Sequence, residues 1–165
     1  MHFLDSWHGL PPRLWLANFC AGILPPFVGN MLRTWALRKL GLQMGRTSLI
    51  WGNPTFLGGA DALQRLKIGE ECGFNIGCLF DLTDQITIGN DVSVGHDVLF
   101  LTSSKDDIAP IVVGDGAWIG ARCTILPGVT IGTGSVIGAN MVIEKDVPPQ
   151  TLLMGAQKIS LARWR

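Results

Sequence analysis

The sequence has few charged residues and no tyrosine. Charged side chains make up 16% of its 165 residues, against about 25% in an average protein. Lysine plus arginine and aspartate plus glutamate number 13 each, so the formal net charge is zero. A basic nucleic-acid-binding domain is therefore disfavoured, and the apolar composition excludes a disordered chain. What remains is a compact, apolar protein with 21 glycines.

The cysteines show neither a metal-binding nor a disulfide spacing. Cys20, Cys72, Cys78 and Cys123 contain no pair separated by two residues. A disulfide framework is typical of much smaller secreted chains. We expect reduced, buried thiols in a cytosolic protein.

The zero net charge hides an uneven distribution. Residues 1–46 carry five basic residues and only Asp5 as an acid, so this part is positive and the remainder is negative. Residues 14–32 are nearly uncharged, but Pro25 and Pro26 interrupt them, which argues against a membrane-spanning helix. No signal-peptide pattern is present either.

The proline pair instead divides the N-terminal part into two short helices. We expect the first to run from about Pro12 to Leu24 and the second from about Val28 to Leu40, with Gly41 as a stop. Such an arm has two compatible interpretations. It packs against its own domain or a neighbouring subunit, or it lies in a membrane interface with its tryptophans and arginines at headgroup level.

From residue 113 onward, an aliphatic residue recurs every six positions. The series is Val113, Ile119, Ile125, Ile131, Ile137 and Ile143, and a small or apolar residue follows each of them four positions later. The same phase continues less regularly upstream, from Ile68 to Phe100. A period of six is neither helical nor typical of a hairpin.

This period predicts a solenoid. Each hexad supplies one short strand and one corner, and three such hexads make one triangular coil with its aliphatic side chains inside. Coils stacked at the strand spacing of about 4.8 Å satisfy one another's backbone hydrogen bonds. Glycine follows four of the aliphatic residues, which we attribute to the unusual corner conformation.

The repeat also carries a family resemblance. Residues 112–159, VVGDGAWIGARCTILPGVTIGTGSVIGANMVIEKDVPPQTLLMGAQKI, resemble the hexapeptide-repeat acyltransferases, whose fold is a left-handed parallel β-helix. The sequence is most similar to the sugar and polysaccharide O-acetyltransferases of the galactoside, maltose and colanic-acid type, and the likeness extends upstream through residues 68–104. The resemblance implies an N-terminal helical arm at 1–46, a β-helix at 47–152 and a C-terminal tail at 153–165.

The same resemblance implies partners and a reaction. It indicates a homotrimer that binds acetyl-CoA between neighbouring β-helices, uses no metal, and acetylates a saccharide hydroxyl. The context it implies is capsule or exopolysaccharide assembly in the cytoplasm, at the inner face of the membrane. Acyltransferases that act on the amine of a nucleotide sugar remain open, since the coils do not distinguish oxygen from nitrogen acceptors. A zinc enzyme on this fold needs three histidine ligands, and only His96 lies in the coils.

At the catalytic position the sequence departs from the family pattern. The family places a histidine base after a Leu-Thr strand end, and here Lys105 occupies that place. The loop that follows is short, with only residues 106–112 before the next hexad. A lysine is protonated near neutral pH and cannot accept a proton unless it is desolvated. His96 is the alternative base, although an exposed turn residue is the simpler interpretation of its position.

The binding positions match the family better. Asn75 lies where these enzymes place an acceptor-binding asparagine, with Asp81 or Asp84 nearby, although Asn75 also suits a corner residue that caps its own turn. For acetyl-CoA, the resemblance implies the small residues Ala121 and Ala139, which lie three hexads apart and therefore on one face. The remaining positions implied for the cofactor are Trp118 by the groove and Lys145 and Lys158 at the nucleotide end.

Two functions therefore follow from the sequence. The first is an acetyl-CoA-dependent O-acetyltransferase of a saccharide. The second is a silent β-helix trimer that keeps CoA binding and has lost its base.

Overall fold

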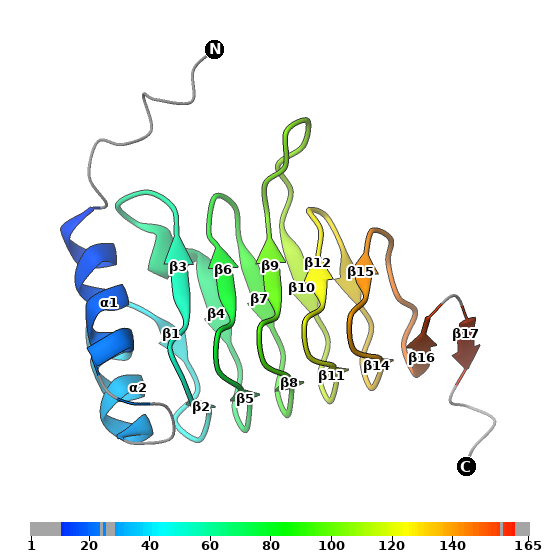
Figure 1. Cartoon of the computed structure of the whole chain (residues 1–165), viewed down its shortest axis with the longest axis horizontal. Coiled ribbons are helices and arrows are strands. Elements are labelled where there is room, and N and C mark those ends of the chain that lie inside the picture. The colour runs from blue at the N-terminus through cyan, green and yellow to red at the C-terminus, as the bar shows by residue number, and fades with distance from the viewer. Residues whose placement is uncertain (1–10, 24, 26–28, 156, 161–165) are drawn as a thin grey trace.

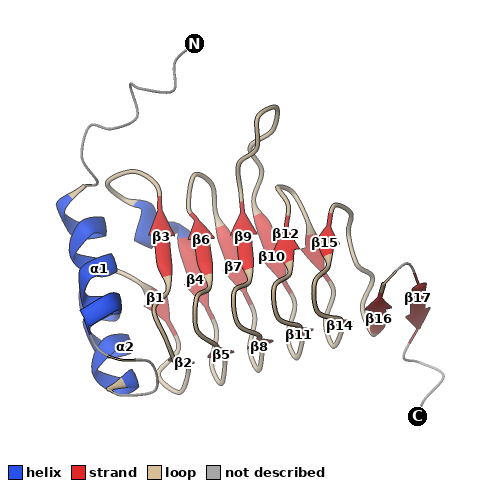
Figure 2. Ribbon diagram, viewed as in Figure 1, coloured by secondary structure: helices blue, strands red, loops and turns tan. Residues whose placement is uncertain are grey.

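The computed structural model describes residues 11–23, 25, 29–155 and 157–160. The chain forms a left-handed parallel β-helix with two helices, α1 (Pro12–Ile23) and α2 (Asn30–Lys39), across its N-terminal end (Figure 1). Short strands alternate with turns along the whole solenoid (Figure 2). The predicted all-β solenoid with an N-terminal helical arm is confirmed. Among the described residues, no helix has both the length and the hydrophobicity to span a bilayer.

Three sheets run along the solenoid, and we call them A, B and C. Sheet A holds β1 (Gln43–Met44), β4 (Leu66–Ile68), β7 (Ile86–Ile88), β10 (Ile111–Val113) and β13 (Thr130–Ile131). Sheet B holds β2 (Leu49–Ile50), β5 (Gly73–Phe74), β8 (Ser93–Val94), β11 (Trp118–Ile119), β14 (Val136–Ile137), β16 (Thr151–Met154) and β17 (Gln157–Ser160). Sheet C holds β3 (Thr55–Leu57), β6 (Leu79–Asp81), β9 (Leu99–Leu101), β12 (Thr124–Ile125) and β15 (Val142–Ile143). All pairings between these strands are parallel except that of β16 with β17.

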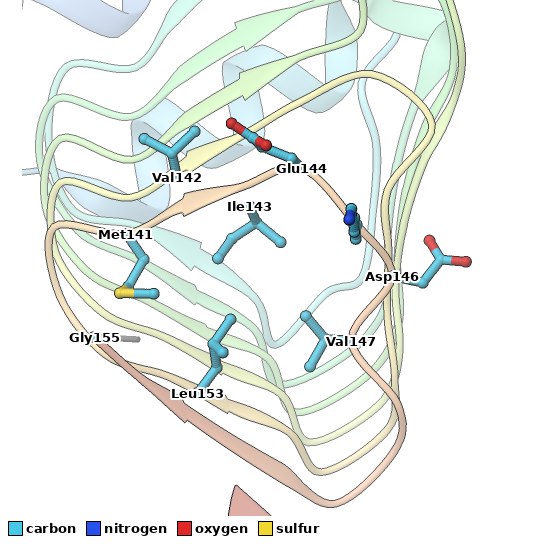
Figure 3. Close-up of a pocket in the computed structure, with 9 residues that line it drawn as sticks. Met141, Val142, Ile143, Glu144, Asp146, Val147, Leu153 and Gly155 are labelled. Atoms are coloured by element: carbon cyan, nitrogen blue, oxygen red, sulfur yellow. The ribbon is translucent and has the colours of Figure 1, made fainter. Parts of the chain in front are cut away.

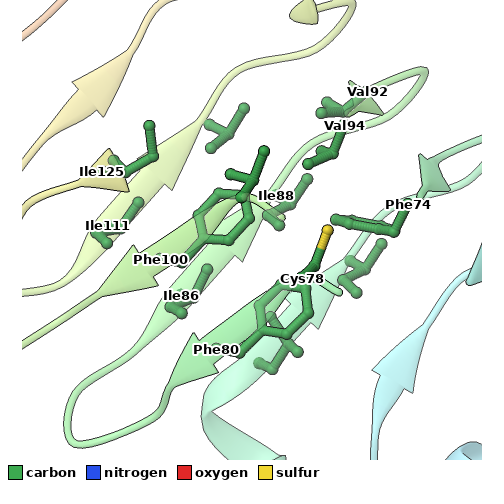
Figure 4. Close-up of a cluster of buried hydrophobic side chains, with 14 of the residues drawn as sticks. Phe74, Cys78, Phe80, Ile86, Ile88, Val92, Val94, Phe100, Ile111 and Ile125 are labelled. Atoms are coloured by element: carbon green, nitrogen blue, oxygen red, sulfur yellow. The ribbon is translucent and has the colours of Figure 1, made fainter. Parts of the chain in front are cut away.

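The hexad residues form the core, as predicted. All six aliphatic residues of the series from Val113 to Ile143 are buried. In sheet C the inward position holds Phe56, Phe80 and Phe100, whose rings stack at centroid distances of 5.6 and 5.2 Å. Figure 4 shows Phe80 and Phe100 among the core side chains. Buried side chains from all three sheets therefore fill one continuous core along the axis.

The coils differ in length, and the extra residues collect at one corner. Along sheet A, Gln43 pairs with Lys67, Lys67 with Thr87, Thr87 with Val112 and Val112 with Thr130. Only the last pair, Val112 and Thr130, is separated by three regular hexads. The residues of the earlier pairs lie further apart in the sequence. The additions fall between sheet C and sheet A, and the first includes a 3₁₀ turn at Ala62–Arg65. The regular period begins only where these additions end.

Glycine serves two different purposes in the coils. Gly134 has φ of 65°, a corner conformation that a side chain rarely adopts, which is the reason expected from the sequence. The glycines that follow the aliphatic residues are different. A Cβ atom on Gly120 would lie 2.6 Å from the backbone nitrogen of Ala139 in the next coil. For these glycines the expected reason is wrong, because close approach between coils excludes the side chain.

The two helices close the free N-terminal edge of the solenoid. The Asn18 side chain accepts a hydrogen bond from the Phe56 backbone nitrogen (2.8 Å) and donates one to the Phe56 oxygen (2.9 Å). The buried Arg33 donates to the backbone oxygen of Ile50, and Arg38 donates to that of Met44. Edge strands carry unpaired backbone groups that favour aggregation, and these side chains satisfy them. We call α1 and α2 together the N-terminal cap.

Candidate functional site

The expected site residues lie on the two corners that flank sheet C. The turns from sheet B to sheet C, which we call the BC corner, carry Asn75, His96, Ala121 and Ala139. The turns from sheet C to sheet A, the CA corner, carry Asp81 at a strand end together with Asp84, Lys105 and Lys145. About five residues at about 3.3 Å each separate the two corners of one coil, roughly 16 Å. Within one chain, His96 and Lys105 therefore do not come together.

Three of these residues form a column at the BC corner. The register that pairs Ser93 with Trp118, and Trp118 with Val136, puts His96, Ala121 and Ala139 at equivalent positions in successive coils. His96 and Ala121 are half-buried, and Ala139 is exposed. The alanines are stacked as expected from their spacing of three hexads, and His96 extends their column by one coil. We call this set the corner column.

Backbone hydrogen bonds hold the column in place. The amide of Arg122 donates to the His96 oxygen at 2.8 Å, and the amide of Asn140 donates to the Ala121 oxygen at 2.9 Å. Trp118 lies on the outer face of β11, three residues before Ala121, and its side chain is 57% exposed. An exposed indole therefore lies on the strand that leads into the corner column.

Asn75 occupies the same corner and caps its own turn. Its Oδ1 accepts a hydrogen bond from the amide of Ile76 at 2.8 Å, and its backbone nitrogen donates to the Val94 oxygen at 3.0 Å. In register, Ile76 rather than Asn75 is the residue equivalent to His96. A role for Asn75 in binding an acceptor remains a prediction.

At the CA corner, Asp81 is an anchor within the chain. Its side chain is only 7% exposed. Oδ1 accepts hydrogen bonds from the amide and the hydroxyl of Thr83, at 3.1 and 2.7 Å. Oδ2 accepts from the amide of Ser103 at 3.0 Å and from its hydroxyl. Thr102 completes the anchor, since its hydroxyl donates to the Asp81 backbone oxygen (2.7 Å) and accepts from the amide of Asp84 (2.9 Å).

This anchor fixes the base of the loop that carries Lys105. Residues 103 and 108 form an antiparallel bridge, and the Ala109 amide donates to the Thr102 oxygen at 3.0 Å. The loop between β9 and β10 is the one that projects furthest from the coils (Figure 1). Lys105, Asp106 and Asp107 at its tip are exposed. The lysine is thus held on a defined loop but is not desolvated by its own chain.

Lys145 lies on the same corner two coils further on. It lines a hollow of about 310 Å³ together with Glu144, Asp146 and Leu153. Looking down the axis, Figure 3 shows that this hollow is the open C-terminal end of the core, with Val147 and Leu153 directed into it. Lys158 belongs to β17, where its backbone pairs with Leu153, and its side chain lies outside the described residues.

The thiols have no place in this site. Burial raises the pKa of Cys78 to about 12 and also raises the pKa values of Cys72 and Cys123. A thiol with a raised pKa is a poor nucleophile. Among the described residues, no group of three or more His, Cys, Asp or Glu side chains is arranged to hold a metal ion.

Comparison with known proteins supports the resemblance. Residues 110–145 match the model of the bacterial transferase hexapeptide family, which is described as six repeats. A protein of Schizosaccharomyces pombe, whose name assigns it provisionally to the acetyltransferases, is 40% identical over 102 residues, 55% of this chain and 49% of the relative. The chain spans about half the length of the curated relatives it matches.

Solved structures match over more of the chain. A hexapeptide-repeat acetyltransferase of Vibrio cholerae, complexed with acetyl coenzyme A, is 28% identical with a TM-score of 0.73, covering 88% of this chain and 82% of that one. A maltose O-acetyltransferase of Clostridium difficile is 27% identical with a TM-score of 0.72, covering 88% and 81%. This chain therefore carries the bacterial transferase hexapeptide repeat and resembles hexapeptide-repeat acetyltransferases in sequence and in fold.

Proposed function

We propose that the protein is an acetyl-CoA-dependent O-acetyltransferase that acts on a saccharide hydroxyl. The observation that carries this proposal is the corner column. Ala121 and Ala139 stack beside the exposed Trp118, on a β-helix that resembles an acetyltransferase complexed with acetyl coenzyme A.

The corner column fits a long, narrow ligand. Two alanines in successive coils leave no large side chain at these two positions of the corner, and Trp118 exposes an apolar ring on the strand that leads to Ala121. The pantetheine arm of acetyl-CoA is such a long, narrow ligand, and it would lie along this apolar surface. Lys145 and Lys158 are proposed to contact the nucleotide phosphates, because a cation suits a phosphate.

The reaction needs a base and a bound acceptor. The acceptor oxygen forms a bond to the acetyl carbon while the carbon–sulfur bond breaks, and the hydroxyl proton passes through the base to the departing thiolate. Histidine is the commonest general base, and His96 belongs to the corner column. Lys105 holds the family position but is exposed. For the acceptor we propose Asn75 and Asp84, with Asp81 acting through the loop it anchors.

We further propose that the protein is a homotrimer with sheet C facing the threefold axis. The outward side chains of sheet C are mostly apolar, namely Leu57, Leu79, Leu99, Leu101 and Val142, with Thr55, Asp81 and Thr124 as the polar members. The corresponding positions of sheet A are mostly polar, namely Gln43, Lys67, Thr87, Val112 and Thr130. Around a threefold axis, this orientation brings the BC corner of one protomer against the CA corner of the next. The corner column of one chain then faces the Lys105 loop of its neighbour.

A specific observation favours a second function. Lys105 replaces a histidine, and residues 102–110 of the loop around it contain no histidine that could take its place. A trimer that binds acetyl-CoA and does not turn it over is the alternative that this observation supports.

The test is CoA release from acetyl-CoA by the purified protein across a panel of saccharides. CoA is quantified by chromatography rather than by a thiol reagent, because Cys20 is only half-buried and would react. Calorimetric titration with CoA is run in parallel. Release that depends on an acceptor supports the acetyltransferase, whereas binding without release supports the silent trimer. Absence of both contradicts the two functions together.

We place this reaction in capsule or exopolysaccharide assembly on the cytoplasmic side of the membrane. Acetyl-CoA is a cytoplasmic metabolite, which supports that side. An amine acceptor on a nucleotide sugar is the alternative that the acceptor panel also tests, by including amino sugars.

A further inference from the structure

The outward face of the N-terminal cap is apolar and exposed. Its members share one side of the two helices: Trp15, Leu16, Phe19 and Ile23 of α1, and Met31, Leu32 and Trp35 of α2. The opposite side of α1 holds Leu14, Ala17 and Ala21, which are buried against the coils. We call the exposed set the cap face.

The cap face is one continuous surface. Residues 15, 19 and 23 follow one another at four-residue spacing, which aligns them on one side of α1. The rings of Trp15 and Phe19 stack at 5.3 Å. A shallow cleft of about 150 Å³ between Ile23 and Leu32 joins the α1 and α2 parts. Exposed apolar patches of this kind mark interaction surfaces.

The cap is firmly held, so its outward face is a fixed feature. Asn18 binds the backbone of Phe56 twice, and the buried Arg33 donates to the Ala21 oxygen at 2.9 Å and to the Asn30 side chain at 3.0 Å. These bonds tie α1 to the first coil and to α2. Turning the apolar side chains inward would break them.

The charged residues of the two cap helices are all basic, although Asp61 of the first coil lines a shallow hollow beside Arg13. The sequence contains no aspartate or glutamate between Asp5 and Asp61. Arg13, Lys39 and Arg46 in this stretch are exposed. An apolar surface with tryptophans and a mainly basic rim is complementary to anionic lipid, where the aromatic rings sit at headgroup level.

The position of the cap suits a planar surface. Both helices lie across the N-terminal end of the solenoid, away from the CA-corner loop between β9 and β10 (Figure 1). In the trimer proposed above, a threefold axis would point all three caps in the same direction. Three weak contacts would then act together. The lipid contact itself does not depend on that assembly.

We propose that the cap face docks the protein onto an anionic membrane surface. Trp15, Phe19 and Trp35 enter the interface, and Arg13 and Lys39 contact lipid phosphates. This binding is peripheral and reversible.

The test is co-sedimentation of the full chain with vesicles of phosphatidylcholine alone or with about one-third phosphatidylglycerol, a content at which each surface cation contributes roughly fivefold in affinity. The protein is expected to bind the anionic vesicles and to be released by salt. Trp15→Ser with Trp35→Ser is expected to weaken binding at least tenfold. Trp118→Ser is the matched control, since Trp118 is equally exposed but lies on β11.

Charge is tested separately. Lys39→Glu is expected to weaken binding to anionic vesicles at least fivefold, whereas the exposed Lys67→Glu on sheet A is expected to have little effect.

Failure of the protein to bind anionic vesicles overturns the proposal. So does binding that the cap variants leave unchanged. The proposal is also overturned if the protein forms a larger oligomer that Trp15→Ser with Trp35→Ser dissociates. That result would assign the cap face to contact with a second copy of the chain. Catalytic activity is not part of this readout.

Discussion

At the scale of single residues, the first prediction concerns Lys105, which occupies the place where the family pattern has a histidine base. We expect Lys105→His to raise acetyl transfer at least tenfold, because general base catalysis typically contributes about 10²–10⁴-fold. The measurement is acceptor-dependent CoA release. His96→Ala is the companion variant: if His96 is the working base, this change abolishes turnover and leaves CoA affinity intact. No gain from Lys105→His, together with loss at His96, would assign the base to the corner column.

The anchor at Asp81 gives a second prediction. In Asp81→Asn the amide nitrogen cannot accept a hydrogen bond, so either the Thr83 or the Ser103 pair of donors loses its acceptor. We expect a loss of about 1–3 kcal/mol in unfolding free energy and faster hydrogen exchange in residues 103–109. Asp84→Asn is the control, because Asp84 Oδ1 accepts only a local bond from Gln85. Unchanged exchange in the loop would contradict the anchor role.

At the scale of the strands and coils, the glycines after the aliphatic residues give a third prediction. A Cβ at Gly120 would meet the backbone of Ala139 at 2.6 Å, and backbone cannot move aside without opening the next coil. We therefore expect Gly120→Ala to destabilise the fold by about 1–3 kcal/mol in urea unfolding. Gly22→Ala in α1 is the matched control and is expected to be neutral or stabilising, since a Cβ there meets nothing.

The coils also show why sequence analysis reached part of the site. Ala121 and Ala139 could be stacked from the sequence because the coil between them consists of three regular hexads. His96 belongs to the same column, but the coil between it and Ala121 includes the long loop from β9 to β10, so counting in hexads does not reveal the match. The contact of Asp81 with Ser103 was missed for the same reason. Ser103 lies one irregular turn further on, and no local pattern links the two residues.

The N-terminal cap was predicted in outline and not in its contacts. Pro25 and Pro26 divide the helices as the sequence suggests, and the observed bounds of α1 and α2 lie within a few residues of those expected. The roles of Asn18 and Arg33 follow from which backbone groups the first coil leaves unpaired. Which backbone groups stay unpaired depends on the tertiary arrangement of the first coil. The apolar run and the basic charge of residues 1–46 therefore indicated an arm that packs on protein or meets a membrane interface, without showing which side is exposed.

At the scale of the whole molecule, the arrangement of the corners around sheet C explains how a split site becomes functional. One chain holds the corner column on the BC corner and the Lys105 loop on the CA corner, about 16 Å apart along the strand. Neither corner of one chain carries both the corner column and the Lys105 loop. In the proposed trimer, a neighbour that presents its opposite corner would supply what is missing, so we expect activity to require that assembly.

The last prediction tests that assembly. Val142 is 58% exposed on the outer face of sheet C, and a carboxylate there would lose its hydration if this face meets the threefold axis. We expect Val142→Glu to convert trimers into monomers in light scattering and to lower CoA affinity in parallel, with the unfolding transition of the coils retained. Val112→Glu is the matched control, since Val112 is 40% exposed on sheet A, away from the proposed contact. A trimer that tolerates glutamate at 142 and dissociates with glutamate at 112 would place sheet A at the axis instead.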